Sequence, residues 1–238
     1  MKTSDYLKTL AKALPNIEFA TDHGRIYDGF VRSLMHEGPD IEVLHPSDYK
    51  GQKTVKLVLS QHPTYDIFED ISAFDPAEHE KLQRRYTEEW IGFLKTNKLP
   101  LNEVNVCSSV NQSTFDALCT QESIESLRIK RFTGKNIAAI GGLKNLKKLF
   151  IESASSVTDI SPLAILGDLE VLILGQTKKV CDYSVLAALK KLKVLGICAY
   201  RTSCDTVIRV KDLEFIKDMP SLEYVDFSDV RSAADPAG

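Results

Sequence analysis

The sequence predicts an α/β fold, a solenoid in which short parallel strands alternate with helical return segments. The first observation comes from residues 157–176, VTDISPLAILGDLEVLILGQ, where leucine and isoleucine recur mostly in steps of three. This step fits neither the 3.6-residue period of a helix nor the two-residue period of a strand. The second observation is that the pattern L-x-x-L-x-L returns along the chain at a nearly constant distance. Each unit is therefore compound, with a strand leg and a return leg that share one core.

The repeat has six copies. Its fourth position falls at residues 104, 127, 149, 172, 195 and 225, so successive copies are 23, 22, 23, 23 and 30 residues apart. In the copy at 169–174, alternating apolar residues point inward from a short strand. Ile160, Leu163 and Leu166 face the same core from the return leg. Because one unit cannot close its core alone, neighbouring units must stack.

A period of roughly 20–29 residues with this pattern is typical of leucine-rich repeats, and residues 100–230 resemble that superfamily. The segment 159–164, DISPLA, resembles the return leg of internalin-like bacterial leucine-rich repeats. There Ser161 is expected to cap a short helical turn and Pro162 to take its first position. The usual Asn or Cys after the strand is missing from every copy, so the turns should be less uniform. The resemblance implies a leucine-rich repeat domain of about six units over residues 100–238, with its short parallel strands on the concave face.

Residues 1–99 lack the period and predict an α/β N-terminal capping region. Residues 54–60 alternate apolar and polar side chains, which predicts a strand. Asp75, Pro76 and Glu78 predict the start of a long helix that ends near Lys98. The region could be a separate small domain or a set of degenerate repeats. We favour a cap docked on the first repeat, because an open-ended array needs a terminal cap for solubility.

Composition argues against several classes of function. The net charge is −3, with no basic excess in either part of the chain, so we expect no nucleic-acid partner. No apolar run approaches the roughly 20 residues that cross a bilayer, and the N-terminus predicts an amphipathic helix, not a secretory signal. The five cysteines lack CxxC spacing and are interpreted as reduced thiols. We therefore expect a cytoplasmic protein without membrane association.

No local motif predicts catalysis, and we expect neither a metal nor a cofactor. All five histidines precede residue 80, and all five cysteines follow residue 106. The enzyme alternative places an activity in residues 1–99 and makes the repeats its targeting arm. It requires several side chains to converge in one cleft, namely those of His23, His45, His62, Asp66 and Asp70.

The predicted binding surface is the concave strand face, with an apolar centre and charged flanks. The candidate partner-binding residues are Arg128, Lys130, Phe150, Val171, Ile173, Val194, Tyr224 and Asp226. An uncovered apolar patch with charged flanks is typical of an interface. We expect Val171, Ile173 and Val194 to be exposed and Leu172 to be buried. The alternative is that this face packs against the N-terminal region or a second copy.

The sequence thus predicts a non-catalytic protein–protein interaction module that binds a protein partner through the concave strand face. By analogy, it could be an inhibitor or immunity protein of a bacterial toxin. Self-association through the same face is a further hypothesis. The last spacing of 30 indicates an insertion within residues 201–209, which either shields the final repeat or contacts a partner.

Overall fold

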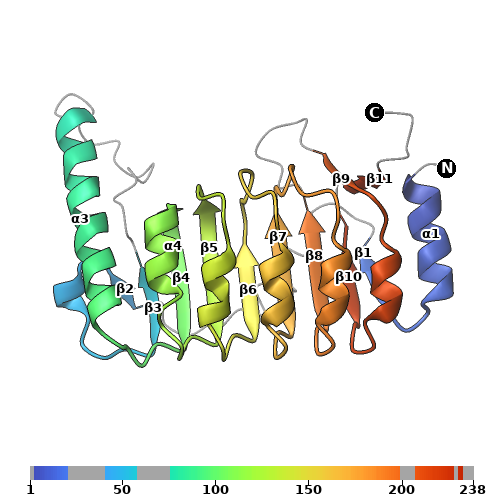
Figure 1. Cartoon of the computed structure of the whole chain (residues 1–238), viewed down its shortest axis with the longest axis horizontal. Coiled ribbons are helices and arrows are strands. Elements are labelled where there is room, and N and C mark those ends of the chain that lie inside the picture. The colour runs from blue at the N-terminus through green and yellow to red at the C-terminus, as the bar shows by residue number, and fades with distance from the viewer. Residues whose placement is uncertain (1–2, 21–40, 58–75, 199–206, 228–229, 233–238) are drawn as a thin grey trace.

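One parallel sheet forms the body of the molecule, and helical segments cover one of its faces. A computed structural model describes residues 3–20, 41–57, 76–198, 207–227 and 230–232. Within these ranges the sheet has nine strands in the order β1-β10-β8-β7-β6-β5-β4-β3-β2, and all neighbouring pairs are parallel. Figure 1 shows the helices and 3₁₀ turns along one side of this sheet. The opposite side, which we call the strand face, corresponds to the predicted concave face.

The strands of this sheet are short. They are β1 (Glu18–Ala20), β2 (Glu42–Val43), β3 (Thr54–Leu57), β4 (Glu103–Val110), β5 (Ser126–Phe132), β6 (Lys148–Ile151), β7 (Val171–Gly175), β8 (Val194–Cys198) and β10 (Tyr224–Asp226). A second, two-stranded sheet pairs β9 (Ile208–Val210) with β11 (Val230–Ser232). The helical elements are α1 (Thr3–Ala13), η2 (Pro46–Asp48), α3 (Pro76–Thr96), α4 (Gln112–Leu118), η4 (Ala138–Gly142), η5 (Ser161–Ile165), η6 (Ser184–Ala188) and η7 (Glu214–Asp218).

The strand register confirms the six predicted repeats. The fourth position of each copy lies opposite the fourth position of the next, in the row Val104, Leu127, Leu149, Leu172, Leu195 and Val225. Each of these side chains is at most 2% exposed. They join the inward residues of the return legs in one continuous core, as the stacked compound unit requires. The predicted α/β solenoid with short parallel strands is therefore confirmed.

Four of the described return legs, η4 to η7, are 3₁₀ helices, and an Asn or Asp side chain begins each of them; the leg after β4 is the α-helix α4. The oxygen of that Asn or Asp accepts the backbone N–H two residues on, in the pairs Asn136–Ala138 at 2.7 Å, Asp159–Ser161 at 2.8 Å, Asp182–Ser184 at 2.9 Å and Asp212–Glu214 at 3.1 Å. Ser161 is the first residue of η5 and donates its own N–H, so its interpretation as the cap is wrong. Asp159 provides the acceptor, and Pro162 follows within the first turn as expected.

Residues 1–99 contribute to both ends of the sheet. β2 and β3 extend it at one end, where α3 buries Trp90 and Leu94. β1 instead pairs with β10 at the opposite end, beside α1 (Figure 1). Of residues 1–99, β2, β3 and α3 therefore lie at the end of the sheet that was predicted to be capped. Residues 3–20 lie at the opposite end, beside β10. The sheet and the core run across residue 99 without a break, and a domain boundary there stays a prediction.

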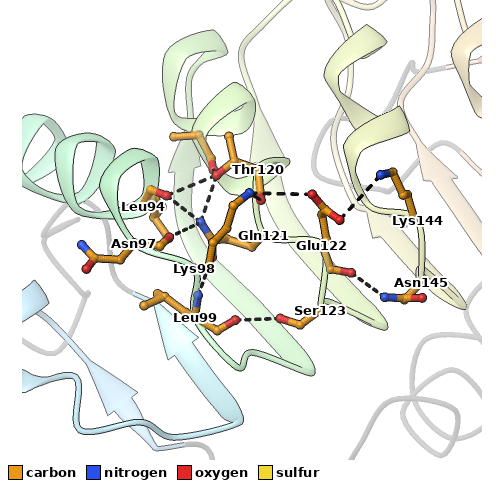
Figure 2. Close-up of polar contacts among 11 residues, drawn as sticks. Leu94, Asn97, Lys98, Leu99, Thr120, Gln121, Glu122, Ser123, Lys144 and Asn145 are labelled. Carbon is orange, nitrogen blue, oxygen red and sulfur yellow. Dashed lines mark hydrogen bonds and ion pairs between the residues drawn. The ribbon is translucent and has the colours of Figure 1, made fainter.

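A buried glutamine joins α3 to the first repeats (Figure 2). Gln121, 1% exposed, donates from Nε2 to the carbonyl oxygens of Leu94 at 2.6 Å and Asn97 at 3.0 Å. Its Oε1 accepts the N–H of Leu99 at 2.9 Å. The end of α3 leaves carbonyl groups without helical partners, and the amide of Gln121 satisfies two of these carbonyl groups and one N–H just beyond the helix. This side chain therefore fixes where the cap helix meets the array.

Two predictions fall partly outside the described residues. The strand predicted over 54–60 is described as far as Leu57, and the helix predicted from Asp75 is described from Pro76. Of the insertion at 201–209, residues 201–206 lie outside the described ranges, and Ile208 begins β9. None of the described helices is long and apolar enough to cross a membrane.

Candidate interaction surface

The strand face divides into a charged half and an apolar half. One row of side chains across the sheet reads Glu42, Lys56, Asn105, Arg128, Phe150, Ile173, Gly196, Asp226 and Ala20. Charged and polar residues occupy its β2–β5 part, and apolar residues begin at β6. The register therefore brings together the predicted apolar centre and places the predicted basic flank beside it.

The apolar half is buried. Phe150, Val171, Ile173, Val194 and Cys198 form a second apolar cluster and are at most 5% exposed. The expectation that the three aliphatic members are exposed is wrong. The repeat pattern shows which face a side chain takes, but not what covers that face.

Residues from both ends of the chain contribute to this cluster. Ala20 of β1 and Tyr224 of β10, on the two strands beyond β8 in the same sheet, pack against the edge of the cluster. Packing of the N-terminal region over this face stays a prediction. Gly196 makes room within the cluster, since a Cβ there would lie 2.7 Å from Cδ1 of Ile173. Asp226 is 5% exposed, and burial raises the pKa of Tyr224 to about 12. Asp226 is therefore not the exposed acidic flank that the sequence predicted for this side, and Asp229, the other predicted member of that flank, lies outside the described residues.

The charged half is accessible. Arg128 donates from Nε to Oε1 of Glu152 at 2.6 Å, and the two side chains are 32% and 17% exposed. Lys130 and Arg131 follow on the same strand and are exposed. Basic side chains outnumber acidic ones on this part of the face, which carries Lys56, Arg128, Lys130, Arg131 and Lys148 against Glu42, Glu103 and Glu152. We call this surface the charged half-face.

Of the five residues that the enzyme alternative requires, only His45 lies in the described part of the chain, where it belongs to a small polar cluster. His45 Nδ1 accepts the N–H of Ser47 at 3.2 Å and lies 2.7 Å from its Oγ, while His45 Nε2 contacts Glu89 of α3. This arrangement caps η2 and ties it to α3, because the N–H of Ser47 already points at the imidazole and cannot bind an oxyanion. His23, His62, Asp66 and Asp70 lie outside the described residues. Among the described residues no group of His, Cys, Asp and Glu could hold a metal ion.

The buried cysteine Cys119 is not an activated thiol. Cys119 and Cys181 are free thiols. Burial raises the pKa of the Cys119 thiol, with Asp116 adding to the effect, so this side chain stays protonated and unreactive at neutral pH. Cys181 is exposed on the turn that precedes η6. Cys204 lies outside the described residues.

The period, the aligned strand register and the stacked 3₁₀ return legs together decide the fold. The chain has a leucine-rich-repeat fold. No protein-family model and no curated protein matches the chain. Solved structures that it resembles include internalin C2 from Listeria monocytogenes, with 21% identity, a TM-score of 0.44, and 63% of this chain and 70% of that chain covered. Internalin F from the same organism has 14% identity and a TM-score of 0.41, with 81% of this chain and 60% of that chain covered.

Proposed function

We propose that the protein is a non-catalytic interaction module that binds a protein partner through the charged half-face. The observation that carries this proposal is the contrast between the two halves of the strand face. The apolar half is already buried, whereas Lys130 and Arg131 are exposed beside the half-exposed Arg128. Regularly spaced side chains on five parallel strands present a broad polar surface, and polar surfaces rich in Arg suit protein recognition.

The charge of this surface indicates the kind of partner. Basic side chains dominate it, and the Arg128–Glu152 pair holds one guanidinium in a fixed orientation. Guanidinium groups bind carboxylates with two parallel hydrogen bonds, so an acidic segment of a folded protein would be complementary. Leu44, which directly follows β2 and is 46% exposed, could add an apolar contact. The partner we propose is therefore an acidic protein surface with an apolar residue at one end.

Neutralisation of a bacterial toxin is the specific role we propose within this class, by analogy with compact inhibitor and immunity proteins. A cytoplasmic location and the absence of nucleic-acid and membrane partners belong to the same proposal. The chain's slight negative charge and its lack of a basic domain support the absence of a nucleic-acid partner. A toxin gene next to the gene for this protein would favour the inhibitor role over other binding functions.

Charge reversal on the charged half-face tests the proposal. Affinity capture from the native host should recover a stoichiometric protein with the wild-type chain. Lys130→Glu combined with Arg131→Glu should reduce that recovery at least tenfold, because it replaces attraction by repulsion. The matched control is Lys178→Glu with Lys179→Glu, two adjacent exposed lysines on the turn after β7. Equal recovery with both double variants, or no stoichiometric protein with the wild type, would overturn the proposal.

A further inference from the structure

The C-terminal end of the sheet is closed by the start of the chain. Residues 3–20, which we call the end cap, comprise α1 and β1, and β1 is the outermost strand beside β10. The next described element along the chain is β2, the outermost strand at the other end. Figure 1 shows α1 and β2 at opposite ends of the molecule. The end cap therefore docks far from the element that follows it in sequence.

Backbone pairing and a few apolar side chains hold the end cap. The N–H of Glu18 donates to the carbonyl of Glu223 at 2.8 Å, and Phe19 lies opposite Val225 in parallel register. Leu10 of α1 is 3% exposed. The remaining apolar residues of the cap that pack on the core are only partly buried, namely Leu7, Leu14, Ile17 and Phe19. This is a strand-addition contact, in which main-chain hydrogen bonds give affinity and side chains give register.

The end cap is held more weakly than an internal strand. None of the three residues of β1 is fully buried, whereas all five residues of β7 are. Segments with few buried contacts open most readily, and opening of β1 would leave β10 with a bare strand edge. Such an edge accepts another strand of the same direction and pattern. The strand that best matches the edge of β10 is β1, which already pairs with it in parallel register.

Residues 21–40 connect the end cap to β2, and their length allows the cap to dock on its own chain or on a second copy. Nine strands are separated by eight steps of about 4.8 Å, so β1 and β2 lie roughly 38 Å apart. The 20 residues from 21 to 40 could span roughly 70 Å when extended, so they can reach. We propose that residues 3–20 are an exchangeable end cap, and that the C-terminal edge of the sheet binds the same segment of a second copy of this chain. This inference concerns a different surface from the charged half-face.

A peptide competition experiment tests the acceptor edge in the full chain. Leu10→Asp puts a charge at the buried contact of α1 and should release the cap. A fluorescent peptide of residues 3–20 should then bind this variant at least tenfold more tightly than the wild type, whose edge is occupied. The same peptide carrying Leu10→Asp is the control and should bind neither. Absence of binding to the variant, equal binding to both proteins, or an unfolded Leu10→Asp chain would each overturn the proposal.

Shortening the link tests exchange directly. Deletion of residues 25–36 leaves eight residues, which span only about 28 Å and cannot bridge the sheet. Light scattering should then show a dimer or larger assembly, while the wild-type chain at micromolar concentration stays monomeric. The same deletion combined with Leu10→Asp should restore the monomer. A monomeric shortened chain, or an assembly that survives Leu10→Asp, would show that the end cap does not exchange between copies.

Discussion

At the scale of single residues, Ile173 shows how far a repeat pattern can be interpreted. The pattern placed Leu172 in the core and Ile173 on the strand face, and both placements are confirmed by the register. The predicted exposure of Ile173 is wrong, because that side chain is 1% exposed. Periodicity encodes direction relative to the sheet, which is a local property. Burial on the strand face also depends on neighbours distant in sequence, such as Ala20 at the edge of the cluster, and no period reports it.

Because Ile173 is buried, a charged substitution there should destabilise the fold. Ile173→Asp should lower the free energy of unfolding by about 3 kcal/mol or more, because it buries a charge without a partner. Ile165→Asp is the control, since Ile165 is 71% exposed, and it should change stability by only about 0.5 kcal/mol. Urea denaturation of both variants measures the difference. Similar stabilities for the two variants would mean that the strand face at β7 opens to solvent.

A buried tyrosine gives a second prediction at this scale. The hydroxyls of Tyr183 and Thr177 lie 2.7 Å apart and both residues are at most 1% exposed. Burial raises the pKa of Tyr183 to about 12, with the Thr177 hydrogen bond acting in the opposite direction. Tyr183→Phe should cost about 1–2 kcal/mol, because the hydroxyl of Thr177 loses its partner away from water.

A double-mutant cycle checks that assignment. Thr177→Val should cost a similar amount, and Tyr183→Phe combined with Thr177→Val should cost less than the sum of the single changes. Chemical denaturation at pH 7 supplies all three values. Strict additivity would mean that the two hydroxyls do not depend on each other and that packing alone accounts for each loss.

At the scale of elements, local signals were sufficient for some segments and not for others. The start of α3 carries its own signal in Pro76 and Glu78, and the helix lies where expected. The starts of the return legs carry one too, since Asn136, Asp159 and Asp182 recur at the repeat spacing and could have been found by the same alignment. The position of β1 has no local signal. Three residues pair with a strand about 200 residues later, and only the folded chain selects that partner.

The junction between α3 and the first repeats depends on Gln121, which makes three hydrogen bonds to the backbone of residues 94–99. Gln121→Leu should destabilise the protein by about 2–3 kcal/mol, because the backbone groups at the end of α3 lose their buried partners. Hydrogen exchange should quicken in α3 before it quickens in β6–β8.

A neighbouring substitution controls for that prediction. Glu122→Gln removes the exposed ion pairs with Lys98 and Lys144 and should change stability by about 0.5 kcal/mol or less (Figure 2). If Gln121→Leu is equally mild, or if exchange quickens uniformly along the array, the glutamine does not anchor the helix.

At the scale of the whole molecule, charge follows the repeat. Ion pairs link adjacent units at the repeat spacing, as in Lys147–Glu125, Lys191–Asp168 and Lys193–Glu170. Each is exposed and contributes little by itself. The Asx acceptors that begin the return legs form a second series along the helical side of the sheet. The pKa values of Asp168 and Glu170 are lowered, first by the hydrogen bonds from their lysine partners. Acid should therefore weaken several units together.

The Asx series gives a pH prediction for the intact array. A hydrogen bond from the Ser161 backbone lowers the pKa of Asp159, and hydrogen bonds from the Ser184 side chain and backbone lower that of Asp182. Because each folded pKa lies below its ordinary value near 3.9, the stabilisation is complete above that value and is lost as pH falls through the folded pKa. Asn136 already fills the equivalent position without titrating.

Asp159→Asn combined with Asp182→Asn should keep the hydrogen bonds, leave the melting temperature nearly unchanged at pH 7, and flatten its fall between about pH 5 and pH 2. Glu88→Gln combined with Asp218→Asn, which also removes two exposed carboxylates, is the control for net charge. An equally flat acid profile for the control would assign acid unfolding to overall charge and not to the return legs.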